Sequence, residues 1–84
     1  MYLAKVYVTY KDSVLDPQGQ AVMGATHRLG YSEITDVRVG KYFEITVAEE
    51  GRDPESVIEE ISDKLLANVN TETYSIEIEK VDGE

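Results

Sequence analysis

The stretch Ile34–Val47 restricts the possible folds more than any other part of the chain. Its apolar side chains occupy odd positions on both sides of Gly40, namely Val37, Val39, Phe43, Ile45 and Val47. The side chains of a β-strand point alternately to its two faces. The segment therefore predicts a strand with one apolar face and one mixed face.

Gly40 raises the question whether the chain turns back in the middle of this stretch. A two-residue hairpin over residues 40–41 would send the apolar residues before the turn to the face of the polar residues after it. A three-residue loop over residues 40–42 would keep the apolar side chains before and after it on the same face, but such loops usually have glycine at their last position. We therefore predict one long strand over residues 34–48, bent or bulged at Gly40. Typical strands have about 5–6 residues, so the spare edge of this strand needs a partner.

Two Asp-Pro pairs predict where the helices begin. An aspartate before a helix accepts a backbone N–H that has no partner in the first turn, and a proline after it has no N–H to leave unpaired. The predicted helices cover residues 16–29, with Gly30 as the stop signal, and residues 53–67. Gly24 lies inside the first helix, where glycine is unfavourable, and it predicts close packing of another backbone there.

Alternating residues predict two further strands. Residues 1–11 carry their apolar side chains mainly on even positions, and residues 74–79 alternate tyrosine or isoleucine with serine or glutamate. The order of elements is then β-α-β-α-β. The last residues, Val81–Glu84, are predicted to be a frayed tail.

These elements predict a single α+β domain over residues 1–84. Two helices would lie on one face of a small antiparallel or mixed sheet, and residues 34–48 would form a long bent central strand shared in an oligomer. A turn at Gly40 would instead give the order βαββαβ, the ferredoxin-like arrangement. The long strand corresponds to that hairpin pulled straight, as in segment-swapped dimers.

The composition excludes several classes of function. The chain has 17 acidic and 8 basic residues and a formal net charge of −9, whereas nucleic-acid binding needs a basic surface. It has no cysteine, so it has no disulfide and no thiolate nucleophile, and no apolar run approaches the ~20 residues of a membrane span. The acidic surface has two interpretations, a solubilising surface or a docking surface for a basic partner.

The reactive side chains do not form a catalytic pattern. His27 is the only histidine and lies inside a predicted helix, and Asp16 is explained by capping. Phosphate-binding glycine loops, nucleophile elbows and metal-ligand spacings do not occur, so we predict no catalytic residue and no metal site. Arg38 and Lys41 flank Gly40. They are either surface cations that balance neighbouring acids or contacts to a partner or an anion.

Four short motifs follow one another along the chain. They are VLDPQG at 14–19, LGY at 29–31, VRVGK at 37–41 with Glu44, and KLLAN at 64–68. Together they resemble the PurS family, the small subunit of phosphoribosylformylglycinamidine synthase, and the resemblance extends from about Lys5 to Tyr74.

The resemblance implies a noncatalytic structural subunit in de novo purine (IMP) biosynthesis in the cytoplasm. The complete enzyme is a glutamine-dependent ligase that uses ATP and magnesium, and the resemblance implies that this chain binds no cofactor itself. It implies that the chain forms dimers or tetramers, bridges the glutaminase and synthetase subunits and supports ammonia transfer between them. Neither nucleic acid nor a membrane is implied as a partner. The candidate interaction residues are Asp16, Gln18, Arg38, Gly40 and Lys41.

A second hypothesis comes from the possible ferredoxin-like arrangement. The chain would then be a regulatory module that binds an amino acid or a nucleotide at a dimer interface. An independent enzyme ranks behind both hypotheses, because the reactive groups do not converge on one site.

Overall fold

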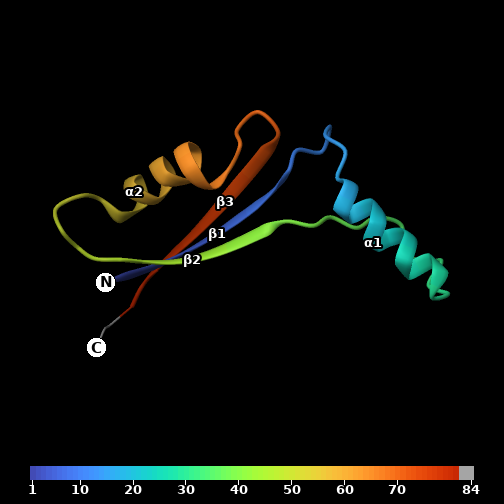
Figure 1. Ribbon diagram of the computed structural model, residues 1–84. Helices are drawn as coiled ribbons and strands as arrows, with labels where there is room; N and C mark the ends of the chain where they lie inside the picture. Colours follow the sequence, from blue (N-terminus) through green and yellow to red (C-terminus); the bar gives the residue numbers. More distant parts are fainter. Residues whose placement is uncertain (82–84) are drawn as a thin grey trace.

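The computed structural model describes residues 1–81 and contains three strands and two α-helices (Figure 1). In chain order the elements are β1 (Tyr2–Tyr10), α1 (Pro17–Arg28), β2 (Lys41–Val47), α2 (Pro54–Ile61), a π-helical turn η1 (Ser62–Leu66) and β3 (Glu72–Lys80). The predicted order of strands and helices is confirmed. Apart from Val81, the predicted frayed tail lies outside the described residues.

The sheet has the strand order β2-β1-β3, and both pairs are antiparallel. The central strand is therefore β1, and the prediction that residues 34–48 form the central strand is wrong. Only the part Lys41–Val47 belongs to the sheet, as an edge strand. The reason lies in the apolar face of β1, whose residues Ala4, Val6 and Val8 are completely buried, because a strand with such a face gains most from neighbours on both sides.

The chain does not turn back at Gly40, so the prediction of no hairpin there is confirmed. Pairing between β1 and β2 ends at Val8 and Lys41, and residues 35–40 continue beyond the sheet without a strand partner. A Cβ atom on Gly40 would lie 2.5 Å from the carbonyl oxygen of Val8. Glycine is needed here because the two backbones approach too closely for a side chain.

The core lies between α2 and one face of the sheet. Ile58 of α2 and Ala67 after η1 are buried against the even-numbered face of β1. Asp53 caps α2 by accepting a hydrogen bond from the backbone N–H of Ser56 at 3.3 Å, as the Asp-Pro pair predicts. One helix and one sheet face thus form the two-layer part of the α+β fold.

The prediction that both helices cover the sheet is wrong for α1. Figure 1 shows α1 at the end of an arm that projects from the sheet, and the arm consists of the 11–16 segment, α1 and residues 29–40. The Cα radius of gyration is 16.6 Å, whereas a compact domain of 84 residues has about 12 Å. Residues 35–40 continue the direction of β2 instead of turning, and this carries α1 past the end of the sheet.

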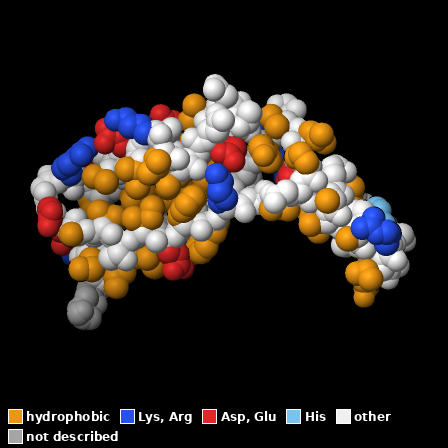
Figure 2. Space-filling view, viewed as in Figure 1, with side chains coloured by type: hydrophobic (Ala, Val, Ile, Leu, Met, Phe, Trp, Pro, Cys, Tyr) orange, Lys and Arg blue, Asp and Glu red, His pale blue; other side chains and the backbone are white. Residues whose placement is uncertain are grey.

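The displaced helix leaves apolar surface uncovered. A groove of about 380 Å³ lies beside α2 and is lined mainly by apolar residues of β2 and α2: Ile45, Val47, Val57, Ile58 and Ile61. Figure 2 shows hydrophobic side chains gathered there and a second group along the arm. Leu29 and Leu15 on the arm are 75% and 69% exposed. No helix within residues 1–81 is both long enough and apolar enough to cross a membrane.

Candidate functional site

Asp16 joins the two segments that form the base of the arm. One carboxylate oxygen, Oδ1, accepts a hydrogen bond from Gly19 N at 2.9 Å and so caps α1. The other, Oδ2, accepts one from Val39 N at 2.8 Å. The side chain is buried although it carries a charge. The bond from Val39, followed by that from Gly19, lowers the pKa of the Asp16 carboxyl below 3.8, since both bonds favour the ionised form.

Gly19 allows the two segments of the arm to touch, and sequence reasoning did not select it. It is buried in the first turn of α1, and a Cβ atom there would collide with the carbonyl oxygen of Val37. The available signal was a glycine three residues after the capping Asp16, a position where glycine is unfavourable for a helix. At Gly24, by contrast, a Cβ atom would meet only the end of the Arg28 side chain, at 3.6 Å, among residues 1–81 outside the backbone of its own helix. Within the described residues, no other segment packs its backbone at Gly24, although the sequence predicts such packing.

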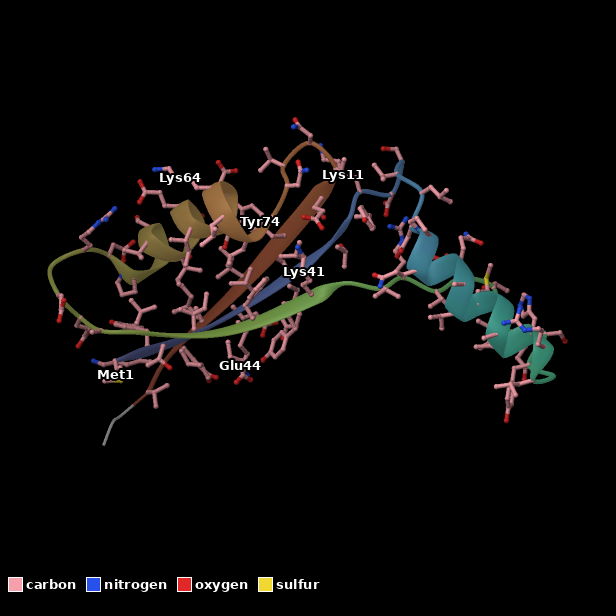
Figure 3. All side chains as sticks on the ribbon, in the orientation of Figure 1. Met1, Lys11, Lys41, Glu44, Lys64 and Tyr74 are labelled. Atoms are coloured by element: carbon pink, nitrogen blue, oxygen red, sulfur yellow. The ribbon has the colours of Figure 1, made fainter. Side chains whose placement is uncertain are left out.

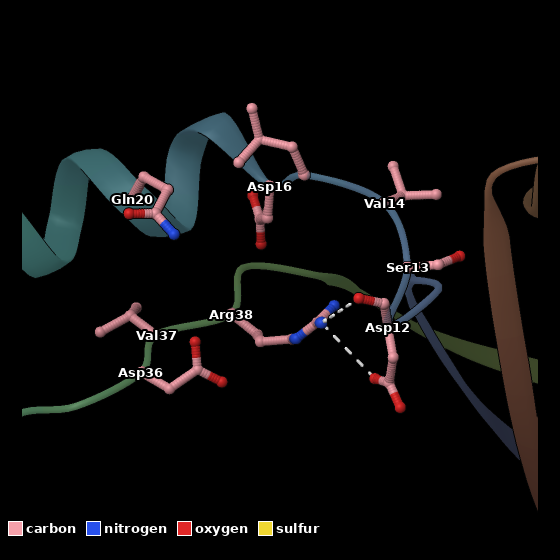
Figure 4. A pocket seen from close by; sticks show the side chains of 9 residues that line it. Asp12, Ser13, Val14, Asp16, Gln20, Asp36, Val37 and Arg38 are labelled. Atoms are coloured by element: carbon pink, nitrogen blue, oxygen red, sulfur yellow. Dashed lines mark hydrogen bonds and ion pairs between the residues drawn. The ribbon is translucent and has the colours of Figure 1, made fainter.

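Arg38 holds the connection between β1 and α1 (Figure 4). Its Nη1 donates to the carbonyl oxygens of Tyr10 at 3.0 Å and Lys11 at 3.5 Å, and its Nη2 donates to that of Asp12 at 3.4 Å. An ion pair of 3.4 Å joins Nη2 to the Asp12 carboxylate, which is fully exposed, so water weakens this pair. The guanidinium is thus turned inward to backbone carbonyl groups of its own chain.

Lys41 lies at the other end of the same segment, close to the sheet. Its Nζ is 3.7 Å from the carboxylate of Glu72 and 3.5 Å from the carbonyl oxygen of Leu66. It shares a pocket of about 180 Å³ with Gln18 and Gly40. This pocket lies between β1, the start of α1 and the beginning of β2.

Three of the five candidate residues belong to the segment at positions 37–41, and Asp16 and Gln18 lie beside it, but the five divide between two pockets. Asp16 and Arg38 belong to a larger pocket of about 350 Å³, whose other lining residues are Asp12, Ser13, Val14, Leu15, Gln20, Asp36 and Val37. Gln18, Gly40 and Lys41 belong to the smaller one. The structure brings them together as the junction between sheet and arm.

The polar groups of the junction hold segments of the chain together. Arg38, the only basic residue of the larger pocket, is already bonded to carbonyl groups. His27 donates from Nε2 to the carbonyl oxygen of Ile34 at 2.8 Å and so ties the end of α1 to the returning chain. Within residues 1–81, no three histidine, cysteine, aspartate or glutamate side chains are grouped to hold a metal ion. The junction fixes the arm relative to the sheet.

Comparison with known proteins decides the family. The family model described as PurS, phosphoribosylformylglycinamidine (FGAM) synthase, matches residues 3–80. The chain belongs to the PurS family. The resemblance inferred from the four motifs is thereby confirmed, and as a PurS chain this protein is a subunit of phosphoribosylformylglycinamidine synthase, a ligase complex of purine biosynthesis.

Relatives and solved structures match over almost the full length of the chain. The Bacillus subtilis subunit PurS is 51% identical over 81 residues, which are 96% of both chains. A structure of B. subtilis PurS has a TM-score of 0.90 at 50% identity and covers 95% of this chain and 100% of that chain.

Two further structures extend the comparison. PurS of Methanocaldococcus jannaschii, described as one of the subunits of formylglycinamide ribonucleotide amidotransferase, has a TM-score of 0.86 at 33% identity, over 98% of this chain and 100% of that chain. A structure of PurLQS from Thermotoga maritima matches with a TM-score of 0.77 at 20% identity, over 93% and 98% of the two chains, and supports the fold alone. The predicted α+β class is confirmed.

Proposed function

We propose that this PurS chain is a noncatalytic structural subunit that bridges the glutaminase and synthetase subunits of the enzyme in the cytoplasm. The observation that carries the proposal is the arm, which holds α1 away from the sheet and from α2 while apolar sheet surface beside α2 stays open. A protein of this shape is completed by other chains. The absence of convergent reactive groups at the junction supports a role in assembly over one in chemistry.

The first partner in this proposal is a second copy of the chain. The accessible surface is 5955 Å², whereas a compact protein of 9.4 kDa exposes about 5000 Å². The difference is similar to the roughly 800 Å² that each partner buries in a typical stable interface. A single copy of the chain therefore exposes about as much extra surface as one stable interface would bury.

The arm and the groove have complementary characters. Val22 and Ala25 of α1 and Leu29 at its C-terminal cap follow one another at helical spacing, and Val22 is 45% exposed. The groove beside α2 is lined mainly by isoleucine and valine, with Glu50 and Arg52 among its other lining residues. We propose that α1 of each copy lies in the groove of the other, because a two-fold exchange of this kind buries both surfaces at once.

The cofactors in this proposal belong to the other subunits. ATP and magnesium would bind the synthetase subunit, and ammonia from the glutaminase subunit would pass to it in the assembled complex. A sheltered transfer keeps ammonia from being protonated by water. The chain described here would bring the two larger subunits together and hold them in position.

Reconstitution tests the bridging role. Glutamine-dependent turnover by the mixed glutaminase and synthetase subunits should appear only when this chain is added. The chain alone should show none. Full activity of the two larger subunits without it would refute the proposal.

Ligand screening separates the proposal from a regulatory role. Glycine, glutamine, ATP and purine nucleotides should leave the melting temperature of the isolated chain unchanged. A rise that depends on ligand concentration would show binding to the folded state and would support the regulatory module instead.

A further inference from the structure

The sheet has a second face, opposite α2, which we call the open sheet face. The register of the three strands places the following residues on it: Leu3, Lys5, Tyr7, Thr9, Tyr42, Glu44, Thr46, Thr73, Ser75, Glu77 and Glu79. Figure 3 shows Glu44 pointing from β2 to the side away from α2, opposite to Tyr74. No helix of residues 1–81 covers this face, and the proposed exchange of α1 concerns the other one.

Two tyrosines form the centre of the open sheet face. Tyr7 and Tyr42 are direct neighbours on β1 and β2, and their ring centroids are 5.0 Å apart with an angle of 33° between the planes. They are 39% and 49% exposed. Two tilted rings in contact on an exposed strand pair offer a continuous aromatic surface, and tyrosine is among the residues that contribute most at protein interfaces.

A carboxylate is fixed beside each ring. The Tyr42 hydroxyl donates to Glu44 Oε2 at 2.8 Å, and the Tyr7 hydroxyl donates to Glu77 Oε1 at 3.5 Å. The bond to Glu44 is the main cause that raises the pKa of Tyr42 to about 12. Each glutamate keeps free lone pairs for a further donor.

The charges on this face select the kind of partner. Glu44, Glu77 and Glu79 face a single base, Lys5, whose Nζ is 3.5 Å from Glu79 and thus already paired. Anionic ligands are therefore disfavoured. A second copy that presented the same face would bring glutamates against glutamates, which costs energy in an interface.

An arginine side chain fits these groups best. Its guanidinium stacks on aromatic rings and, at the same time, donates paired hydrogen bonds to carboxylates. We propose that the open sheet face docks an arginine-bearing surface of one of the two larger subunits. This inference rests on the proposed bridging function and names the face and the chemistry by which that function is carried out.

Binding of this chain to each purified larger subunit tests the inference. The double variant Glu44→Gln/Glu77→Gln keeps the shape of both side chains and removes both charges. Its affinity for one subunit should fall about tenfold or more, because charged pairs that lose water in an interface contribute strongly. The dependence of that affinity on salt should also become weaker. The matched control is Glu55→Gln/Glu59→Gln on the exposed side of α2, which should bind like the wild type.

Circular dichroism and the mass in solution, measured for both double variants, complete the test. Unchanged folding and oligomeric state with weaker subunit binding support the inference. Wild-type affinity of the Glu44→Gln/Glu77→Gln variant for both larger subunits overturns it and leaves the bridging role intact, whereas a change of oligomeric state would assign the face to a second copy. Failure of the wild type to bind either subunit would refute the bridging role and this inference with it.

Discussion

Asp16 shows how one residue can serve both the helix and the junction. An Asp-Pro pair identifies it from sequence as a helix cap, and the bond from Gly19 fulfils that expectation. The bond from Val39 could not be predicted, because Val39 lies far along the chain and local patterns do not report such contacts. The residue therefore connects the start of α1 to the chain that returns from it.

Two substitutions separate these roles. Asp16→Ala removes both bonds and should lower the melting temperature by several degrees, since loss of a cap alone is destabilising. Asp16→Asn keeps one acceptor oxygen for the cap but places an NH₂ group opposite the N–H of Val39, so it should lower the melting temperature by less. Thermal unfolding followed by circular dichroism checks this order. Equal losses in both variants would mean that capping of α1 contributes nothing.

The stability contribution of the Asp16 charge should depend on pH. Its pKa in the folded protein lies below the ordinary value of 3.8, so the ionised form stabilises the fold fully above about pH 4. The contribution is lost as the pH falls through the lower folded-state pKa. The melting temperatures of wild type and Asp16→Asn should therefore differ by a constant amount from pH 5 to 7 and converge below that range. A difference that grows on acidification would contradict this assignment.

Among the elements, the helix α1 contains two glycines with opposite surroundings. Gly19→Ala should destabilise the chain by about 1–3 kcal/mol, because the new methyl group overlaps the backbone at Val37. Gly24→Ala meets no backbone within the chain and improves helix propensity by up to about 1 kcal/mol. Denaturant unfolding under conditions that dissociate oligomers measures both. Equal destabilisation would show that Gly24 is packed within the protomer.

Gly24→Ala should also weaken self-association if another copy packs against α1. Sedimentation over a range of concentrations gives the dissociation constants of wild type and variant. An unchanged constant would place the contact between copies elsewhere on the helix.

The elements also show what sequence can and cannot predict. The parity of residues 37–47 predicts an extended segment without a hairpin, and the capping signals predict the starts of both helices. The same alternation of apolar and polar side chains continues through Val37 and Val39, which have no strand partner among residues 1–81. An alternation of apolar and polar residues indicates that one face of a strand will be buried. It does not indicate whether the segment that buries this face belongs to the same chain. The sequence therefore placed this segment in the centre of the sheet and α1 on it, and both placements are wrong.

The candidate residues were only partly understood from sequence. The short motif around Gly40 supplied candidates for contacts to a partner and did not predict a junction within the chain, and the structure shows why Gly40 is glycine, since Val8 lies against it. The role of Arg38 depends on carbonyl groups more than 25 positions earlier, and Gly19 carried only a weak signal. The open sheet face could not be predicted from local patterns, because its residues come from three separate strands whose register is set by the fold.

At the scale of the whole molecule, the protein is elongated and leaves apolar surface uncovered. Its extents of 52 × 31 × 14 Å describe a thin body with an arm, and its two apolar surfaces lie apart on the groove and on α1. We propose that these two surfaces meet between two copies of the chain.

Cross-linking between copies tests this claim most directly, because the chain has no cysteine of its own. One sample carries Val22→Cys on α1, and another carries Val57→Cys in the groove beside α2. After the two are mixed and allowed to exchange, a short bis-maleimide linker should give a covalent dimer that contains one chain of each variant. A control with Ser75→Cys, which lies on the open sheet face and does not line the groove, in place of Val57→Cys should give little. Efficient mixed dimers with the groove cysteine are the predicted result, and a product that remains monomeric at concentrations where the chain is folded would contradict the account.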